Sequence, residues 1–336
     1  MELTREQAIQ FIARKLASLG VSKDDAEKTA EVLVEAELRE DPSHGISCLL
    51  SILKSIKNKE IISGKKPEII VENNATAIIN GENILGPVSG ISAVNLAMKK
   101  AKEHGISAVS IRKSHHLFTL GYYTKIIALN NLIGILTTST APAIFAPGGL
   151  EKVLGTNPFS ISIPSKENPL VIDMSSTHVA RGKLREAVKN EKNIPLTWAL
   201  DEMGNPTNNP EEGLKGSLQP LGGYKGFALA LAIDILSGIL SESASGKEIF
   251  GTSMHVDNKD KKTAYKGDLV IVIDISKFTE INLFKSRVSN LIKDIENSRK
   301  IDGIEKIHIP GERAHKNKDK LINIDEKLHK EIIDFN

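Results

Sequence analysis

The sequence is poor in the features that mark disulfide-bonded and membrane-spanning proteins. Cys48 is the single cysteine, so no internal disulfide can form, and no cationic stretch followed by an apolar segment opens the chain. The longest apolar stretch, 226–240, is interrupted by Asp234 and Ser237. It is shorter than the roughly 20 apolar residues that a membrane-spanning helix needs. We therefore expect a cytoplasmic protein with no membrane partner.

Neither sign of charge predominates. The 44 basic residues nearly balance the 42 acidic ones, and the formal net charge of +2 gives no general attraction to nucleic acid. Hydrophobic residues make up 40% and charged residues 26% of the chain, as in ordinary folded proteins. A length of 336 residues is typical of about two domains. We expect a fully folded protein without a nucleic-acid partner.

Several familiar enzyme signatures are also missing. No G-x-G-x-x-G segment follows an expected strand and no G-x-x-x-x-G-K-[ST] segment occurs, which disfavours a classical dinucleotide-binding fold. The chain has no G-x-S-x-G, H-E-x-x-H or paired C-x-x-C segment. These absences disfavour a serine hydrolase and a zinc enzyme, and we expect no metal site.

What is present is a pattern of hydrophobic periodicity that predicts an α/β protein with helical ends. Thr4 and Gln7 form a capping box before a helix that ends at Gly20, and Ser22 begins a second helix. Prolines and glycines between 147 and 169 exclude a continuous helix there. The expected strands are 68–71, 76–79, 106–111, 133–138, 170–172 and 268–275, and the later expected helices are 88–104, 122–129 and 227–240.

Two histidine segments are candidates for proton transfer. His44 lies in an expected turn, where the hydroxyl of Ser43 could select the imidazole tautomer by hydrogen bonding. His115 and His116 follow an expected strand. Adjacent side chains on a strand point to opposite faces, so at most one of this pair faces a given pocket. The alternative for each segment is a turn or surface histidine without chemistry.

Two further segments could hold a nucleotide. The glycine-rich segment 222–226 precedes an apolar helix, so its backbone N–H groups and Lys225 could bind phosphate. Asp173 ends an apolar run and could accept a hydrogen bond from a ribose hydroxyl. An ordinary helix-entry turn and an ordinary strand end are the alternatives.

Taken in order, nine segments resemble the malate/L-lactate/ureidoglycolate dehydrogenase family, which also includes sulfolactate dehydrogenases and cyclic imino-acid reductases such as piperideine-2-carboxylate reductases. They span nearly the whole chain. Their order favours a proton-transfer role for both histidine segments over a turn or surface histidine without chemistry. The segments are SHG at 43–45, SHH at 114–116 with GYY at 121–123, APGG at 146–149, LGTNP at 154–158, IDMS at 172–175, ARGK at 180–183, IP at 194–195 with WALD at 198–201, PLGGYKG at 220–226, and IPGE at 309–312.

The resemblance implies an α/β fold with a nucleotide-binding domain of a non-Rossmann type and helical terminal segments. Residues 1–75 would form a helical N-terminal segment that packs with 276–336, and 76–275 would form the central cofactor-binding domain. The resemblance also implies a homodimer. NAD or NADP would exchange a hydride with a small 2-hydroxy or 2-oxo acid of the malate, lactate, sulfolactate or ureidoglycolate type.

By the same resemblance, His44, His116 and Ser43 would be the catalytic residues. One histidine would exchange the hydroxyl proton of the substrate, for which an imidazole pKa of about 6.5 is suited, and the other would polarise the oxygen or position the ring. Either histidine could take either role. The matching cofactor positions are His116, Leu117, Phe118, Thr119, Leu120, Thr140, Asp173, Met174, Ser175, Lys225, His308, Pro310, Gly311 and Glu312.

The chain departs from the family pattern around the expected substrate. Cys48 and Ile52 stand where an arginine and a tyrosine are usual, and 117–119 reads Leu-Phe-Thr instead of an aromatic followed by small residues. An arginine would bind a substrate carboxylate through two hydrogen bonds, which Cys48 cannot do.

This departure leaves two hypotheses. Either the substrate differs and Arg112, Arg181 or Lys183 supplies the positive charge, or the enzyme is weakened. The alternatives to a hydroxy-acid dehydrogenase are therefore a cyclic imino-acid reductase and a nucleotide-binding paralogue without activity.

Overall fold

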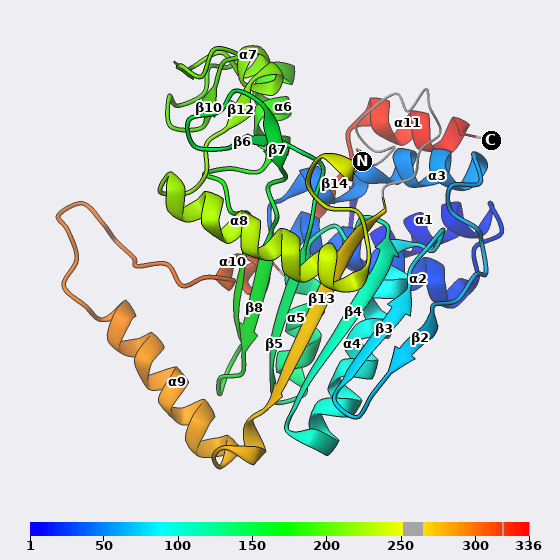
Figure 1. Cartoon of the computed structure of the whole chain (residues 1–336), viewed down its shortest axis with the longest axis vertical. Coiled ribbons are helices and arrows are strands. Elements are labelled where there is room, and N and C mark those ends of the chain that lie inside the picture. Colours follow the sequence, from blue (N-terminus) through cyan, green and yellow to red (C-terminus); the bar gives the residue numbers. More distant parts are fainter. Residues whose placement is uncertain (251–264, 318, 336) are drawn as a thin grey trace.

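The computed structural model describes residues 1–250, 265–317 and 319–335, and its centre is a seven-stranded mixed sheet (Figure 1). The strand order is β2-β3-β4-β13-β5-β8-β9. Within this sheet β3 and β4 pair in parallel, and every other neighbouring pair is antiparallel. The strands are β2 (Glu68–Glu72), β3 (Thr76–Asn80), β4 (Ile106–Ser114), β5 (Leu132–Thr138), β8 (Phe159–Ile163), β9 (Leu170–Met174) and β13 (Lys266–Asp274).

This sheet is unlike the mostly parallel sheet of a Rossmann domain. Its central strand β13 lies between β4 and β5, although more than a hundred residues separate it from both in the sequence. Leu269, Val270 and Val272 of β13 are buried. The predicted non-Rossmann α/β fold is confirmed.

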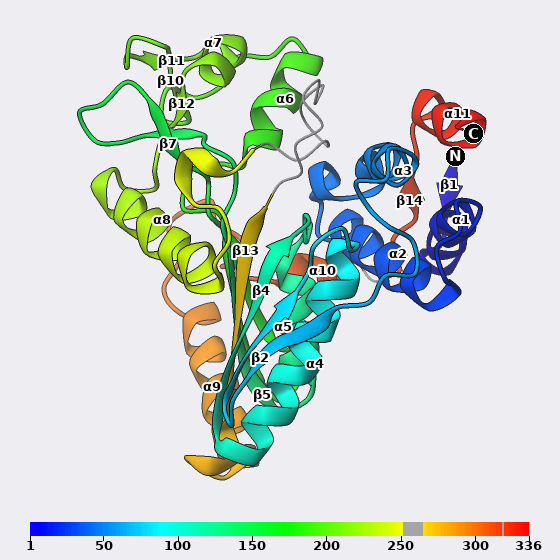
Figure 2. The same ribbon diagram turned by 45° about the vertical axis from the view of Figure 1, so that its right-hand side comes forward.

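Helices cover both faces of the sheet (Figures 1 and 2). α4 (Gly86–His104) and α5 (Leu120–Leu129) pack on one face, and α8 (Tyr224–Ser237) packs across β5 and β13 on the other. α4 ends at Gly105, whose φ of 86° is left-handed and therefore favours glycine. The predicted helices 88–104 and 122–129 are confirmed, and the expected helix 227–240 ends earlier, before the short 3₁₀ turn η3 (Ile239–Ser241).

The N-terminal helices are α1 (Arg5–Ala17), α2 (Lys23–Leu38) and α3 (Leu49–Lys57). The Thr4 hydroxyl accepts from the backbone N–H of Gln7 at 3.2 Å, and the Gln7 side chain accepts from the N–H of Thr4 at 2.9 Å. Ser22 accepts from the N–H of Asp25 in the same way at the start of α2. The predicted caps of both helices are confirmed. Between α2 and α3 lie the turns η1 (Pro42–His44) and η2 (Ile46–Cys48).

A small lobe stands beyond one end of the sheet, facing the N-terminal helices across the molecule (Figure 2). It has its own apolar core, which includes Ile144, Leu184 and Leu218. Its elements are β6 (Ile144–Phe145), β7 (Lys152–Leu154), α6 (Arg181–Lys189), β10 (Ala199–Leu200), β11 (Pro206–Thr207), α7 (Pro210–Lys215) and β12 (Ser217–Leu218).

The C-terminal part of the chain returns to the N-terminal helices. β1 (Glu2–Leu3) pairs with β14 (Ile322–Asn323), and α11 (Glu326–Asp334) contacts α3. β2 belongs to the central sheet although it precedes residue 76. The division into 1–75 with 276–336 and 76–275 stays a prediction. The remaining described elements are η4 (Gly246–Glu248), η5 (Ile275–Lys277), α9 (Ile281–Glu296) and α10 (Glu312–Lys316).

One segment, Tyr224–Ser241, is long and apolar enough by composition to cross a membrane. In the structure its inner face packs on the sheet, and Asp234 on that face accepts hydrogen bonds from Asn157 and from the backbone of Gly246. Its outer face exposes apolar side chains, namely Leu231, Ile235, Leu236, Ile239 and Leu240. The segment is thus a helix of the folded core with an uncovered apolar side.

Candidate active site

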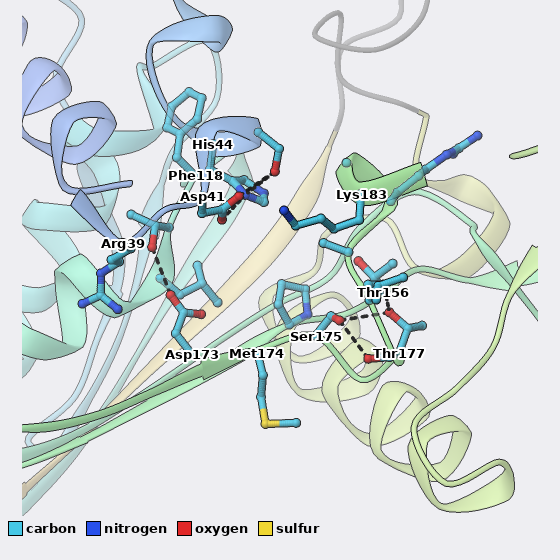
Figure 3. Close-up of a pocket in the computed structure, with 18 of the residues that line it drawn as sticks. Arg39, Asp41, His44, Phe118, Thr156, Asp173, Met174, Ser175, Thr177 and Lys183 are labelled. Atoms are coloured by element: carbon cyan, nitrogen blue, oxygen red, sulfur yellow. Dashed lines mark hydrogen bonds and ion pairs between the residues drawn. The ribbon is translucent and has the colours of Figure 1, made fainter. Parts of the chain in front are cut away.

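A cavity of about 1360 Å³ lies between the η1–η2 turns, one end of the sheet, α6 and the segment 308–314 (Figure 3). Pockets for drug-sized ligands measure roughly 300–1,000 Å³, so this one has room for a dinucleotide together with a small acid. Every predicted site residue lines it except Lys225 and Arg112, which is one of three options for the substrate's positive partner. The predicted residues that line it are Ser43, His44, Cys48, His116, Leu117, Phe118, Thr119, Leu120, Thr140, Asp173, Met174, Ser175, Arg181, Lys183, His308, Pro310, Gly311 and Glu312.

Lys225 is the first exception. It lies exposed in the first turn of α8, after Gly222 and Gly223, which both have left-handed backbones. Lys225 does not line the cavity. The geometry of the cavity therefore does not support the predicted role of Lys225 in cofactor binding.

His44 is held by a carboxylate that motif reasoning missed. Its Nδ1 lies 2.6 Å from Oδ2 of Asp41 and 3.2 Å from Oγ of Ser43, while the Ser43 hydroxyl donates to the other oxygen of Asp41 at 2.6 Å. A carboxylate on Nδ1 keeps the proton on that nitrogen and leaves Nε2 for proton exchange. An acidic residue three positions before a histidine in a proline-containing turn is the sequence signal that could have found Asp41.

The surroundings of His44 favour its protonated form. Burial alone would lower the pKa of His44, but the hydrogen bond and charge of Asp41, with the charge of Asp173, raise this pKa above its ordinary value. Burial acts against the ionised form of Asp41, yet the contacts with His44 and Ser43 hold the pKa of Asp41 below its ordinary value. The two shifts therefore act in the same direction, because each residue stabilises the charged form of the other.

His116 has the opposite hydrogen-bonding pattern. Its Nδ1 accepts from the backbone N–H of Phe118 at 2.9 Å, so the proton of the neutral ring is on Nε2. Phe118 adopts a left-handed φ of 63° that turns its N–H toward this ring. The rings of His44 and His116 are stacked, with centroids 5.5 Å apart and an interplanar angle of 15°. Two imidazoles with different tautomers therefore stand side by side in one cavity.

Its neighbour His115 does not line the cavity. Burial and the charge of Lys266 lower the pKa of His115 to about 4, so this histidine is neutral. The expectation that only one of the two adjacent histidines faces the pocket is confirmed.

Asp173, at the end of β9, offers one oxygen to a ligand. Its Oδ2 accepts from the N–H of Gly121 at 2.6 Å and from the hydroxyl of Thr119 at 3.1 Å (Figure 3). Its Oδ1 has no hydrogen bond among the described residues. Burial raises the pKa of Asp173 despite the nearby Arg39.

Arg39 is a second residue that motif reasoning missed. A Cβ added to Gly121 would come within 2.5 Å of Arg39 Nη1 and 2.9 Å of Asp173 Oδ2, so this glycine lets the two charged groups approach each other. Nη2 of Arg39 is buried without a hydrogen-bond partner among the described residues. The available oxygen of Asp173, with the guanidinium group of Arg39 beside it in the cavity lining, fits a ribose hydroxyl of a nicotinamide dinucleotide.

The segment 308–312 borders the same cavity. Gly311 has a φ of 88°, and a Cβ there would come within 2.8 Å of the carbonyl oxygen of Val171, so the segment packs closely on β9. Glu312 contacts both Lys306 and His308, and its contact with Lys306 lowers the pKa of Glu312 to about 2. These ion pairs hold the segment 306–312 together, while Gly311 provides its close contact with β9.

Basic residues on α6 reach the cavity, whereas Arg112 does not. Arg112 pairs with Glu242 at 3.1 Å and lies outside the lining, so the option that it binds substrate gains no support. Lys183 points toward His44 and Asp41 (Figure 3). Four more basic residues that line the cavity are absent from the predicted set, namely Arg185, Lys189, Arg313 and the buried Lys266. Among the described residues, no three His, Cys, Asp or Glu side chains gather as a metal site would require.

Comparison with known proteins agrees with this geometry. The sequence pattern of the malate/L-lactate dehydrogenase family matches residues 3–333. A malate/(S)-sulfolactate dehydrogenase of Methanothermus fervidus is 41% identical over 332 residues, which are 98% of this chain and 95% of that protein. A ureidoglycolate dehydrogenase (NAD(+)) of Escherichia coli K12 is 30% identical over 315 residues, which are 93% of this chain and 88% of that protein.

Solved structures give the same result. The sulfolactate dehydrogenase from Methanocaldococcus jannaschii superimposes with a TM-score of 0.91 at 36% identity, covering 100% of this chain and 96% of that one. Sequence and fold therefore agree over nearly the whole length. The chain belongs to the malate/L-lactate dehydrogenase family of oxidoreductases.

Proposed function

We propose that the protein interconverts a small 2-oxo acid and the corresponding 2-hydroxy acid, with His44 as the proton donor and acceptor and His116 as a hydrogen-bond donor. The opposite hydrogen bonding of the two Nδ1 atoms carries this proposal. Asp41 holds the Nδ1 proton of His44, so Nε2 of His44 can gain and lose a proton. The N–H of Phe118 occupies Nδ1 of His116, so Nε2 of His116 carries a hydrogen atom in the neutral ring.

The chemistry of each residue follows from this arrangement. During reduction His44 gives its Nε2 proton to the substrate oxygen, and during oxidation it removes that proton. Asp41 stabilises the imidazolium form through their 2.6 Å contact. His116 donates its Nε2–H to the same oxygen and stabilises the charge that develops there. When bound, the nicotinamide cofactor supplies or accepts the hydride.

The residues that would hold NAD or NADP surround Asp173. Its free oxygen would accept from a ribose hydroxyl, with Arg39 beside it and 117–120, Thr140 and 308–312 completing the walls. The name of the Escherichia coli relative includes NAD(+), which supports a nicotinamide cofactor for this chain. Names of other relatives support malate or sulfolactate as the substrate type.

A homodimer in the cytoplasm completes the proposal. The uncovered apolar face of α8 (Leu231, Ile235, Leu236, Ile239 and Leu240) is the surface that supports association, since such patches often mark interfaces. Light scattering at assay concentration should give the mass of two chains. A mass of 36.6 kDa, that of one chain, would contradict a homodimer.

The function is tested by following NADH and NADPH oxidation with oxaloacetate, sulfopyruvate, pyruvate and cyclic imines such as piperideine-2-carboxylate. We expect turnover with at least one 2-oxo acid. Turnover with cyclic imines alone would replace the proposal by an imino-acid reductase. Cofactor binding without any turnover would replace it by an inactive paralogue.

The raised pKa of His44 predicts opposite pH dependences in the two directions. Reduction needs protonated His44, so kcat/KM for reduction should be highest below the pKa of His44 and fall as pH rises through it. Oxidation needs neutral His44 and should rise through the same pKa, which lies above the ordinary value. Asp41→Asn removes the charge that raises this pKa, and both curves should move to lower pH. Unchanged curves in that variant would contradict the role of Asp41.

A further inference from the structure

α6 presents a row of basic side chains to the cavity. Arg181, Arg185 and Lys189 all line it and are spaced four residues apart, which places them on one face of the helix. The helix also touches the histidine turn, because a Cβ added to Gly182 would come within 2.6 Å of Cβ of Ser43. The basic face therefore lies beside the reacting centre.

Two of these charges have no counter-ion in the part of the chain that the structure describes. Lys183 pairs with Glu186 at 2.9 Å and Arg39 pairs with Glu35 at 3.3 Å, so both are partly neutralised. Arg181 and Arg185 have no ion pair or hydrogen bond among the described residues, although both are only half-exposed. Like charges four residues apart on a helix repel each other. Binding of an anion would relieve this repulsion.

Cys48 carries no charge at a position where the family usually has an arginine, and Arg185 lies nearby. Cys48 is buried, and burial raises the pKa of its thiol to about 12, so it stays neutral and donates to the carbonyl oxygen of Ser43 at 3.1 Å. Arg185 is close enough that its charge acts on this thiol. The family usually has an arginine at position 48. In this chain the guanidinium group of Arg185 reaches the same region from α6, on the opposite wall of the cavity.

We propose that Arg185, together with Arg181, binds the acidic groups of the substrate in place of the arginine that Cys48 replaces. Each guanidinium can bind one carboxylate or sulfonate through a pair of hydrogen bonds. Two unpaired guanidinium groups therefore fit a substrate with two acidic groups, a dicarboxylate or a sulfonated carboxylate. A 2-oxo acid with one acidic group leaves one arginine unpaired. This inference rests on the proposed function.

The test compares Arg185→Gln with wild type on oxaloacetate or sulfopyruvate, which have two acidic groups, and on pyruvate, which has one. We expect kcat/KM for the substrates with two acidic groups to fall about 10- to 100-fold, mainly through KM, and kcat/KM for pyruvate to fall much less. Arg287→Gln, which removes an exposed arginine from α9, is the matched control and should have no effect. Equal losses on all three substrates would overturn the proposal.

A charge-relocation experiment separates this role from a structural one. Adding Cys48→Arg to Arg185→Gln should raise kcat/KM at least tenfold above that of Arg185→Gln alone, because the new guanidinium group faces the same ligand. Cys48→Arg alone should give no gain, since it places a second positive charge beside Arg185. A gain in the single variant with no recovery in the double variant would show that Arg185 does not replace the missing arginine.

Equilibrium binding makes the outcome independent of turnover. L-malate binding in the presence of NAD⁺ is measured by calorimetry for wild type and Arg185→Gln. Weaker binding in the variant supports the role of Arg185 even if no substrate turns over and the proposed function fails. Equal binding, or no binding to wild type, overturns the role of Arg185 even if the enzyme is active on another 2-oxo acid.

Discussion

Replacing His44 by glutamine is expected to lower kcat in both directions by about 10²- to 10⁴-fold, the usual contribution of a general acid or base. Glutamine keeps a polar side chain of similar reach but cannot exchange a proton near neutral pH. Steady-state rates at saturating cofactor and substrate measure the loss. Cofactor affinity should change little, because the proposed ribose contacts are made by Asp173 and Arg39 and not by His44.

A suitable control for this variant is His104→Gln. His104 is a partly exposed histidine at the end of α4, outside the cavity lining, and its replacement should leave kcat unchanged. A loss smaller than tenfold in His44→Gln would show that another group carries the proton.

Replacing His116 by alanine is expected to lower kcat by about 10²- to 10³-fold, as the loss of one donor to a developing negative charge does in other enzymes. His116→Gln should recover part of this loss, because the glutamine amide can donate a hydrogen bond without gaining or losing a proton. Rates of the two variants at one pH give the comparison. If His116→Gln has the same kcat as His116→Ala, His116 does not act by donating a hydrogen bond from Nε2.

Local features of the fold could be predicted from the sequence because they depend on nearby residues. The caps at Thr4 and Ser22, the strands β2 and β3, and the end of α4 before Gly105 all follow from short patterns. α6 is not predicted by hydrophobic periodicity, because Leu184 is the one buried residue of its nine. The insertion of β13 between β4 and β5 is a long-range pairing that local patterns do not encode.

The site was predicted to a similar extent and for similar reasons. Family motifs place nearly all of the expected residues around one cavity, since a motif reflects shared chemistry. Asp41 and Arg39 act through contacts with His44 and Asp173 that appear only once the chain is folded. Arg185 reaches the cavity because α6 packs against the histidine turn. Such partners are set by tertiary structure rather than by residue type alone.

The roles proposed for His44 and His116 are tested most directly by the pH dependence of kcat/KM for reduction in wild type, His44→Gln and His116→Gln. Wild type and His116→Gln are expected to lose activity as pH rises through the same raised pKa, because His44 still titrates in both. His44→Gln should have a low rate without that transition. If the transition instead disappears in His116→Gln and persists in His44→Gln, the roles proposed for the two histidines are reversed.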